Sequence, residues 1–162
     1  NIQGDEPFIS GMMIDQAIEP LLFDLEVNVS TLAKLIDNVE EFNSPSVVKV
    51  VFDYKNFALY FSRSPIPFVR DAKDDKEMLE KAEIYKHIGL YVYRKEYLLK
   101  FTKLEPTDLE QWEKLEQLRM LENGFKIKIV DTEYDSFSVD TPEDLEKARK
   151  IYSKLKKIEL AK

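Results

Sequence analysis

The predicted fold is centred on one stretch of sequence, Tyr85-Lys86-His87-Ile88-Gly89-Leu90-Tyr91-Val92-Tyr93-Arg94. The stretch is rich in β-branched and aromatic residues, which favour strands. Because successive side chains of a strand point to opposite faces, these apolar residues fall on both faces. A strand that is apolar on both faces is typical of the interior of a sheet that helices cover on each side. We therefore expect a strand over residues 85–94 that is buried on both faces.

Strand and helix patterns alternate on both sides of this stretch. Strands are predicted from the apolar runs at residues 27–32, 47–52, 57–61, 125–130 and 136–139, and helices at residues 11–25, 37–42, 95–101, 107–121 and 142–155. The turn-like residues 53–56 join two of the strands into a β-hairpin. Because strands alternate with helices and one hairpin is inserted, the sequence predicts an α/β protein with a mixed sheet.

Capping residues mark where the predicted helices begin. Ser10 precedes the first helix as an N-cap, and Pro20 is expected to kink this helix or end it early. Thr107 and Glu110 form a Thr-x-x-Glu capping box that opens one long helix. Thr141-Pro142 opens the last helix. Its apolar stripe is expected to be buried and consists of Leu145, Ala148, Ile151, Tyr152 and Leu155.

Length and composition indicate a single domain over residues 1–162. The chain has 162 residues, of which 44% are hydrophobic, enough for one core. Residues 69–83 are polar and charged, and we expect them to form a mobile surface insert with a short helix. The first residues, Asn1-Ile2-Gln3, look like the tail of a strand and do not start with Met. We therefore expect that the N-terminal part of the domain is missing.

Charge and residue types argue against several classes of function. Lys plus Arg total 24 and Asp plus Glu total 31, which gives a net charge of −7 and argues against nucleic-acid binding. The chain has no Cys, so it forms neither a disulfide nor a thiolate metal site. No apolar run approaches the roughly 18 residues of a membrane span. We expect a cytoplasmic protein with no membrane or nucleic-acid partner.

Two aspartates stand at places where α/β sheets bind ligands. Asp5 follows the end of a predicted strand, and Asp140 lies between a predicted strand and a helix. Ligands of open α/β sheets gather beyond the carboxyl ends of the strands, and Mg²⁺ prefers a few carboxylate oxygens together with phosphate oxygens. From their spacing alone, the structural interpretation is favoured, in which Asp5 is a turn residue and Asp140 precedes a helix cap, and nothing in the spacing brings the two together.

Each of the other polar candidates has two interpretations, a structural role or a role at a binding site. His87 is the only histidine; it shares a strand face with Gly89 and Tyr91, so it either packs in the core or lines a pocket. Arg63 suits a carboxylate ligand or a surface salt bridge. A third set has helical spacing, which predicts a solvated helix face or a cluster at a site. It consists of Glu113, Glu116 and Gln117.

Six strings in this order resemble the CMP-Kdo synthetase family, the 3-deoxy-manno-octulosonate cytidylyltransferases, across nearly the whole chain. The strings are Asn1-Ile2-Gln3-Gly4-Asp5-Glu6-Pro7, Asn43 with Val48-Lys49-Val50-Val51, Tyr60-Phe61-Ser62-Arg63 with Ile66-Pro67, Lys86-His87-Ile88-Gly89-Leu90-Tyr91-Val92-Tyr93-Arg94, Leu115-Glu116-Gln117-Leu118-Arg119 and Val139-Asp140-Thr141-Pro142-Glu143-Asp144-Leu145. CMP-sialic acid synthetases do not usually carry this set.

The resemblance implies a Rossmann-like nucleotide-diphospho-sugar transferase fold and a homodimer. It implies transfer of CMP from CTP to the anomeric hydroxyl of Kdo, which yields CMP-Kdo and pyrophosphate for lipopolysaccharide biosynthesis and uses Mg²⁺. Asp5 and Asp140 match the family's catalytic, metal-binding aspartates. The residues that match positions around the sugar are Gln3, Arg63, His87, Tyr91, Glu116 and Gln117.

Two features depart from the family pattern. The family's N-terminal nucleotide loop and the segment that reads cytosine and ribose have no counterpart in these residues, so we expect the chain by itself to lack most of the CTP site and to be inactive. Ser138 stands where the family usually has Gly, and it restricts the backbone before Asp140. The alternatives are a related nucleotidyltransferase for another acidic sugar and a truncated, non-catalytic chain.

Overall fold

A computed structural model describes residues 1–136, 138, 139 and 141–159. The strands are β1 (Val29–Leu35), β2 (Lys49–Phe52), β3 (Ala58–Ser62), β4 (Tyr85–Tyr93) and β5 (Lys128–Asp131). The helices are α1 (Gly11–Phe23), α2 (Val39–Asn43), α3 (Asp75–Lys81), α4 (Lys95–Phe101), α5 (Asp108–Glu113), α6 (Gln117–Glu122) and α7 (Pro142–Glu159).

The five strands form one mixed sheet in the order β3-β2-β4-β1-β5. β1 and β5 are parallel and the other neighbouring pairs are antiparallel, so the predicted mixed sheet is confirmed. β4 is the middle strand, a position that agrees with the predicted burial of both its faces. The predicted hairpin is β2–β3, and its turn is closed by Asp53, whose carboxylate accepts hydrogen bonds from the N–H groups of Lys55 at 2.9 Å and Phe57 at 2.8 Å.

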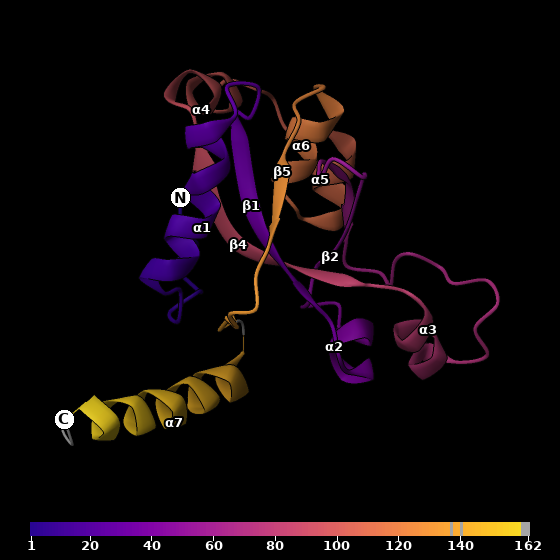
Figure 1. Ribbon diagram of the computed structural model, residues 1–162, viewed down its shortest axis with the longest axis vertical. Coiled ribbons are helices and arrows are strands. Elements are labelled where there is room, and N and C mark those ends of the chain that lie inside the picture. Colours follow the sequence, from indigo (N-terminus) through magenta and orange to yellow (C-terminus); the bar gives the residue numbers. More distant parts are fainter. Residues whose placement is uncertain (137, 140, 160–162) are drawn as a thin grey trace.

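Helices cover both faces of the sheet (Figure 1). α1 packs on one face through an apolar cluster of Met13, Ala17, Leu32, Ile88 and Leu90. α6 packs on the opposite face in the main core, which includes Val29, Ala33, Phe61, Tyr91, Leu118 and Met120. Alternate residues of β4 therefore serve different faces, and the odd-numbered ones from His87 to Tyr93 point to the side of α6.

The long helix expected from Thr107 onward is wrong, because the chain breaks between α5 and α6. Lys114 adopts a left-handed conformation with φ 56°, which is uncommon for a residue other than glycine. The break lets Leu115 and Leu118 enter the core while Glu113 turns toward β3. Glu113, Glu116 and Gln117 therefore do not share one helix face, and tertiary packing has overridden the helical pattern.

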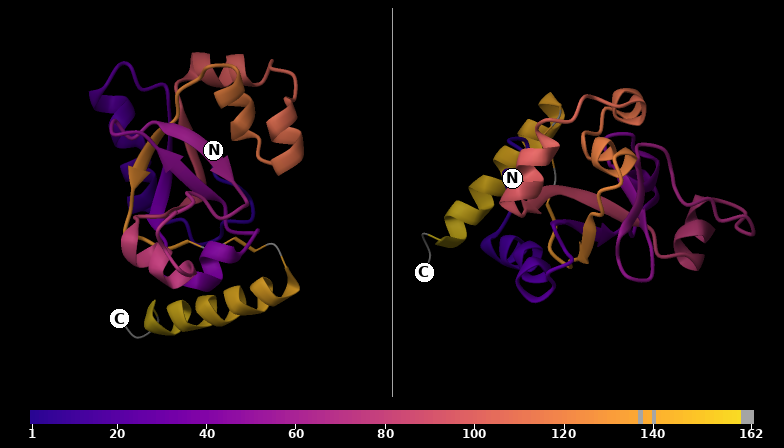
Figure 2. Two further views of the ribbon diagram at one scale, coloured as in Figure 1. Left: turned by 90° about the vertical axis from the view of Figure 1, so that its right-hand side faces the viewer. Right: turned by 90° about the horizontal axis from the view of Figure 1, so that it is seen from above.

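The last helix forms as predicted, but the expected burial of its apolar stripe is wrong. Leu145 is 42% exposed and Tyr152 is 62% exposed, whereas Ala148 is buried. α7 lies apart from the sheet, at the lower edge of the left view in Figure 2, so little of the chain covers the stripe. The side chain of Leu155 lies outside the described residues. Helical spacing predicts an apolar stripe, but not what packs against it.

Two smaller expectations also differ from the structure. Pro20 lies inside α1, and the helix does not end early but continues to Phe23. Ser136, Ser138 and Val139 do not form the expected strand, since this segment bonds instead to the N-terminal stretch. Among the described residues, no helix is both long and apolar enough to cross a membrane.

Candidate functional site

An open cavity of about 1260 Å³ lies beside β4 and the α5–α6 corner. Its wall combines the N-terminal stretch, β4, the loops around β2 and β3, the α5–α6 corner and the segment that leads into α7. Six of the eight residues predicted for the site line this cavity, namely Gln3, Asp5, Arg63, His87, Glu116 and Gln117. Residues from distant parts of the sequence are thus brought to one place.

Backbone pairing with β4 places Gln3 at the cavity. The N-terminal amine of Asn1 donates to the Tyr91 carbonyl at 2.7 Å, and the Tyr91 N–H donates to the Asn1 carbonyl at 2.8 Å. Farther along, the Gln3 N–H donates to the Gly89 carbonyl at 3.2 Å. A Cβ at residue 89 would meet the Gln3 Cδ at 3.0 Å, so glycine leaves the space that the amide group occupies.

The segment after β5 is attached to the same N-terminal stretch. The Val139 N–H donates to the Asp5 carbonyl at 2.8 Å, and the Ser136 hydroxyl donates to the Glu6 carboxylate. Residue 139 is therefore adjacent to Asp5 in space. Asp140 itself lies outside the described residues, so the predicted convergence of Asp5 and Asp140 on one cation stays a prediction.

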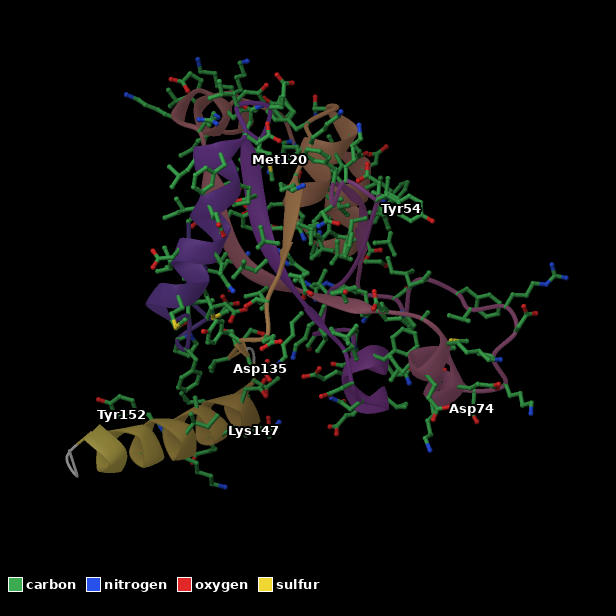
Figure 3. The ribbon with its side chains drawn as sticks, in the orientation of Figure 1. Tyr54, Asp74, Met120, Asp135, Lys147 and Tyr152 are labelled. Atoms are coloured by element: carbon green, nitrogen blue, oxygen red, sulfur yellow. The ribbon has the colours of Figure 1, made fainter. Side chains whose placement is uncertain are left out.

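Ion pairs hold this segment against the sheet. Asp135, which Figure 3 shows where the chain leaves β5 for α7, pairs with Lys34 at 3.0 Å and Lys86 at 3.1 Å. Lys86 also pairs with Glu41 at 2.7 Å. Burial opposes the charged form of Asp135, but the hydrogen bonds from Lys34 and Lys86 hold its pKa below the usual range. The charges around Asp135 thus fix the chain just before the region of Asp140.

The described part of the chain has no group of three or more His, Asp or Glu residues placed to hold a metal ion. This does not conflict with magnesium, because Mg²⁺ in nucleotide sites usually takes one or two carboxylates and completes its shell with phosphate oxygens and water. Asp5 lines the cavity, so its carboxylate fits that kind of site.

Arg63 is oriented by two backbone carbonyls. Its Nε donates to the Glu113 carbonyl at 2.8 Å and its Nη1 donates to the Pro45 carbonyl at 2.9 Å. The Glu113 carboxylate accepts hydrogen bonds from the backbone N–H of Arg63 at 2.9 Å and from the Ser62 hydroxyl at 2.6 Å. Since a guanidinium has five N–H donors, three of them stay available to a ligand.

Lys49 supports the wall from below and was not singled out by the sequence pattern. It is fully buried, and its ammonium donates to the carbonyls of Ser44 at 2.9 Å, Val47 at 2.6 Å and Arg63 at 2.7 Å. Burial lowers the pKa of Lys49 to about 8, so the charged form still prevails at neutral pH. The lysine ties the loop before β2 to the residue that carries the guanidinium.

His87 lies at the floor of the cavity. Its Nε2 is 2.9 Å from the Thr31 hydroxyl, and its ring meets the edge of Phe61 with centroids 5.2 Å apart. Burial lowers the pKa of His87 to about 3, so the imidazole is neutral at physiological pH. A neutral imidazole offers one donor and one acceptor, which suits hydroxyl groups rather than anions.

Tyr91 lies deeper than the other predicted residues. Its side chain is 1% exposed in the main core, where its ring is 5.2 Å from that of His87. Burial raises the pKa of Tyr91 far above its usual range. Its hydroxyl has no hydrogen-bond partner among the described residues. The side chain therefore supports His87 from the core, and its predicted contact with a sugar stays a prediction.

The α5–α6 corner presents Glu116 and Gln117 to the cavity. Gln117 is only 3% exposed, yet its amide makes no hydrogen bond with the described residues. A bidentate ion pair between Arg119 and Glu110 stabilises the corner. Arg119 donates from Nε to Oε2 of Glu110 at 2.7 Å and from Nη2 to Oε1 at 2.5 Å. Neither polar atom of the Gln117 amide is among the described buried groups without a partner, so the amide is open to the cavity and can bind a polar ligand.

Comparisons with known proteins agree with this picture. The model of the cytidylyltransferase family matches residues 1–129. The 3-deoxy-manno-octulosonate cytidylyltransferase of Geotalea uraniireducens is 53% identical over 97% of the chain and 63% of its own length. The enzyme of the same name from Pelobacter propionicus is 54% identical over 94% of the chain and 61% of its own length.

A solved structure gives the same result. The structure of CMP:2-keto-3-deoxy-manno-octonic acid synthetase complexed with CTP matches with a TM-score of 0.83 and 38% identity. The match covers 95% of the chain and 61% of that protein. The chain therefore spans about three fifths of the length of these relatives.

Proposed function

Because the chain belongs to the cytidylyltransferase family, we propose that it is part of an enzyme that transfers CMP from CTP to the anomeric hydroxyl of Kdo, with release of pyrophosphate. The relatives that it matches over more than nine tenths of its length are 3-deoxy-manno-octulosonate cytidylyltransferases. The proposal extends their reaction to the protein that contains this chain.

The main support is the cavity that gathers six residues from separate parts of the chain. Gln3, His87 and Gln117 supply neutral donors and acceptors, which suit the hydroxyl groups of a sugar. Arg63 and Lys114 supply positive charge on the same wall. A ligand that combines several hydroxyls with a carboxylate has the chemistry that this wall requires.

Arg63 suits the carboxylate of the sugar. Two of its N–H groups are fixed on the carbonyls of Glu113 and Pro45, and the planar group is therefore held in one orientation. Its guanidinium makes no ion pair with the described acidic residues. A preoriented guanidinium can bind a carboxylate with two parallel hydrogen bonds, which would set the sugar's direction in the cavity.

Asp5 stands where the triphosphate and the sugar hydroxyl are expected to meet. In this proposal its carboxylate holds Mg²⁺, and Asp140 provides the second carboxylate. When bound, Mg²⁺ neutralises phosphate charge and lowers the pKa of the attacking hydroxyl. The protein's remaining contribution is to orient the two substrates and to hold the sugar hydroxyl in line with the α-phosphorus. No residue needs to form a covalent bond.

The experiment measures pyrophosphate release from CTP, Kdo and Mg²⁺ by the full-length product of the gene that encodes this chain. N-acetylneuraminic acid replaces Kdo in a matched reaction. Release that depends on Kdo and is far slower with the second sugar supports the proposal. Faster release with N-acetylneuraminic acid indicates an enzyme for another acidic sugar, and no release with either sugar refutes the proposal.

The proposal also includes a homodimer, as the family resemblance implies, and a cytoplasmic location. The apolar residues exposed on α7, among them Leu145 and Tyr152, are consistent with contact to a second chain. Sedimentation of the full-length protein at several concentrations measures the oligomeric state, and a monomer at all concentrations contradicts this part. Cell fractionation measures the location.

A further inference from the structure

The floor of the cavity contains a bulge in β4 that has a chemical consequence. Thr31 of β1 pairs with Tyr91, but the next residue, Leu32, pairs with Ile88. Gly89 and Leu90 are therefore extra residues on β4 without partners on β1. Bulges re-aim local groups of a strand, and this one brings two carbonyls of β4 to a single side chain of β1.

That side chain is the hydroxyl of Thr31, which is fully buried. Its Oγ1 lies 2.7 Å from the Leu90 carbonyl and 3.3 Å from the Ile88 carbonyl. It also lies 2.9 Å from the Nε2 atom of His87. Three polar atoms thus surround one hydroxyl, which has a single proton to donate.

Only one arrangement of donors and acceptors in this cluster is favourable. Carbonyl oxygens only accept, so the Thr31 proton goes to the nearest of them, that of Leu90. The Thr31 oxygen can then only accept from Nε2, which must carry the proton of the neutral imidazole. In the opposite arrangement the Thr31 proton points to Nε2 and its oxygen faces two carbonyls without any donor, which is costly in a buried place.

The second ring nitrogen of His87 is left as an acceptor on the cavity side. Nδ1 makes no hydrogen bond with the described residues, and it is not among their buried polar atoms without a partner. Solvent therefore reaches it, and His87 lines the cavity next to Gly89 and Gln3. An unprotonated Nδ1 accepts a hydrogen bond and cannot donate one.

We propose that Thr31 is a positioning residue that fixes His87 as the Nε2–H tautomer, so that Nδ1 receives a hydrogen bond from a hydroxyl of the bound sugar. This inference rests on the proposed function for the identity of the ligand, but not for the tautomer. It specifies the polarity of the contact: the sugar donates and the protein accepts. An analogue in which that hydroxyl is replaced by a methyl ether has nothing to donate and is rejected.

The first test reads the tautomer directly from ring ¹⁵N spectra of the full-length gene product at neutral pH. The His87 signals are identified by their loss in His87→Gln. We expect a protonated, pyrrole-type Nε2 and an unprotonated, pyridine-type Nδ1. In Thr31→Val the proton is expected to distribute over both nitrogens, whereas Thr31→Ser keeps the wild-type pattern because it keeps the hydroxyl.

A proton on Nδ1 in the wild-type protein overturns the inference, and so does a Thr31→Val spectrum identical to that of the wild type. If Thr31→Val does not fold, the wild-type spectrum and Thr31→Ser still decide the point. These spectra need no substrate, so the tautomer is tested even if no Kdo-dependent activity exists and the proposed function fails.

The second test reads the contact with the sugar. In Thr31→Val we expect the KM for Kdo to rise on the order of tenfold, the loss that one hydrogen bond of ordinary strength produces. The KM for CTP should stay the same, and Thr31→Ser should restore the KM for Kdo. A Thr31→Val enzyme that changes the tautomer but keeps the KM for Kdo overturns the assignment of Nδ1 to the sugar.

Discussion

Replacing Gly89 with alanine tests how β4 holds Gln3 at the cavity. The added Cβ would lie 3.0 Å from Cδ and 3.4 Å from Cγ of Gln3, and closer still to its amide oxygen. Carbon atoms normally stay about 3.5–4.0 Å apart, so the amide must move by at least about half an ångström. Because the group that must move is the end of a flexible side chain, we expect the amide to swing away while the fold is kept.

The magnitude follows from what the movement removes. The backbone bond from the Gln3 N–H to the Gly89 carbonyl does not involve the side chain, so the loss of folding free energy should lie near about 1 kcal/mol, the low end of what overpacking costs. If the amide binds the sugar through one hydrogen bond, its displacement costs about 0.5–1.5 kcal/mol. That cost corresponds to a fall of roughly two- to twelvefold in kcat/KM for Kdo.

The assay is a double-mutant cycle with Gly89→Ala, Gln3→Ala and the pair, each measured as kcat/KM for Kdo in the full-length protein. Once Gln3 is truncated, the new Cβ has nothing to displace, so the double variant should match Gln3→Ala. Gly4→Ala is the matched control, since no atom lies within 4 Å of its added Cβ. Effects that add within about 0.5 kcal/mol would refute the reasoning, because additivity is the mark of independent sites.

Three further outcomes are expected. The hydrogen bond from Arg119 holds the pKa of Glu110 below its usual range. The contribution of Glu110 to stability is therefore complete above about pH 4.3 and is lost as the pH falls through the lowered pKa. In urea titrations at several pH values, Glu110→Gln should reduce the loss of unfolding free energy at acid pH, and an unchanged loss contradicts the assignment. Arg63→Lys should lower kcat/KM for Kdo on the order of tenfold with little change in the KM for CTP, because an ammonium cannot hold two carbonyls and a carboxylate in one plane; wild-type kinetics would count against the carboxylate role. Asp5→Asn should raise the Mg²⁺ concentration for half-maximal activity by about tenfold, and an unaltered magnesium titration excludes Asp5 as a ligand.

Local signals predicted most of the elements. The N-cap Ser10, the Asp53 turn and the apolar stretch at residues 85–94 each act over a few residues, and α1, the β2–β3 hairpin and β4 form where they indicate. Six of the eight site residues that the family strings named line the cavity. Such features are readable because the chemistry that produces them lies within one turn or one strand.

Several parts of the site were not predicted from the sequence. A lysine at a left-handed position breaks the helix expected after Thr107, although Lys114 is not a residue type that marks such a break. Lys49 is found under the cavity wall because three carbonyls from two loops meet there. Thr31 joins the site only because a bulge shifts its pairing with β4. Each depends on contacts between residues far apart in the chain.

The sequence by itself determined the α/β class, the strand buried on both faces and the family, because these follow from short-range patterns and from strings that can be recognised without any knowledge of contacts. Only the tertiary structure decided which side chains meet at the cavity and which of them are buried. The physical reason is that the Thr31 hydroxyl lies 2.9 Å from His87 Nε2 across 56 residues of sequence, and strand pairing alone sets such a distance.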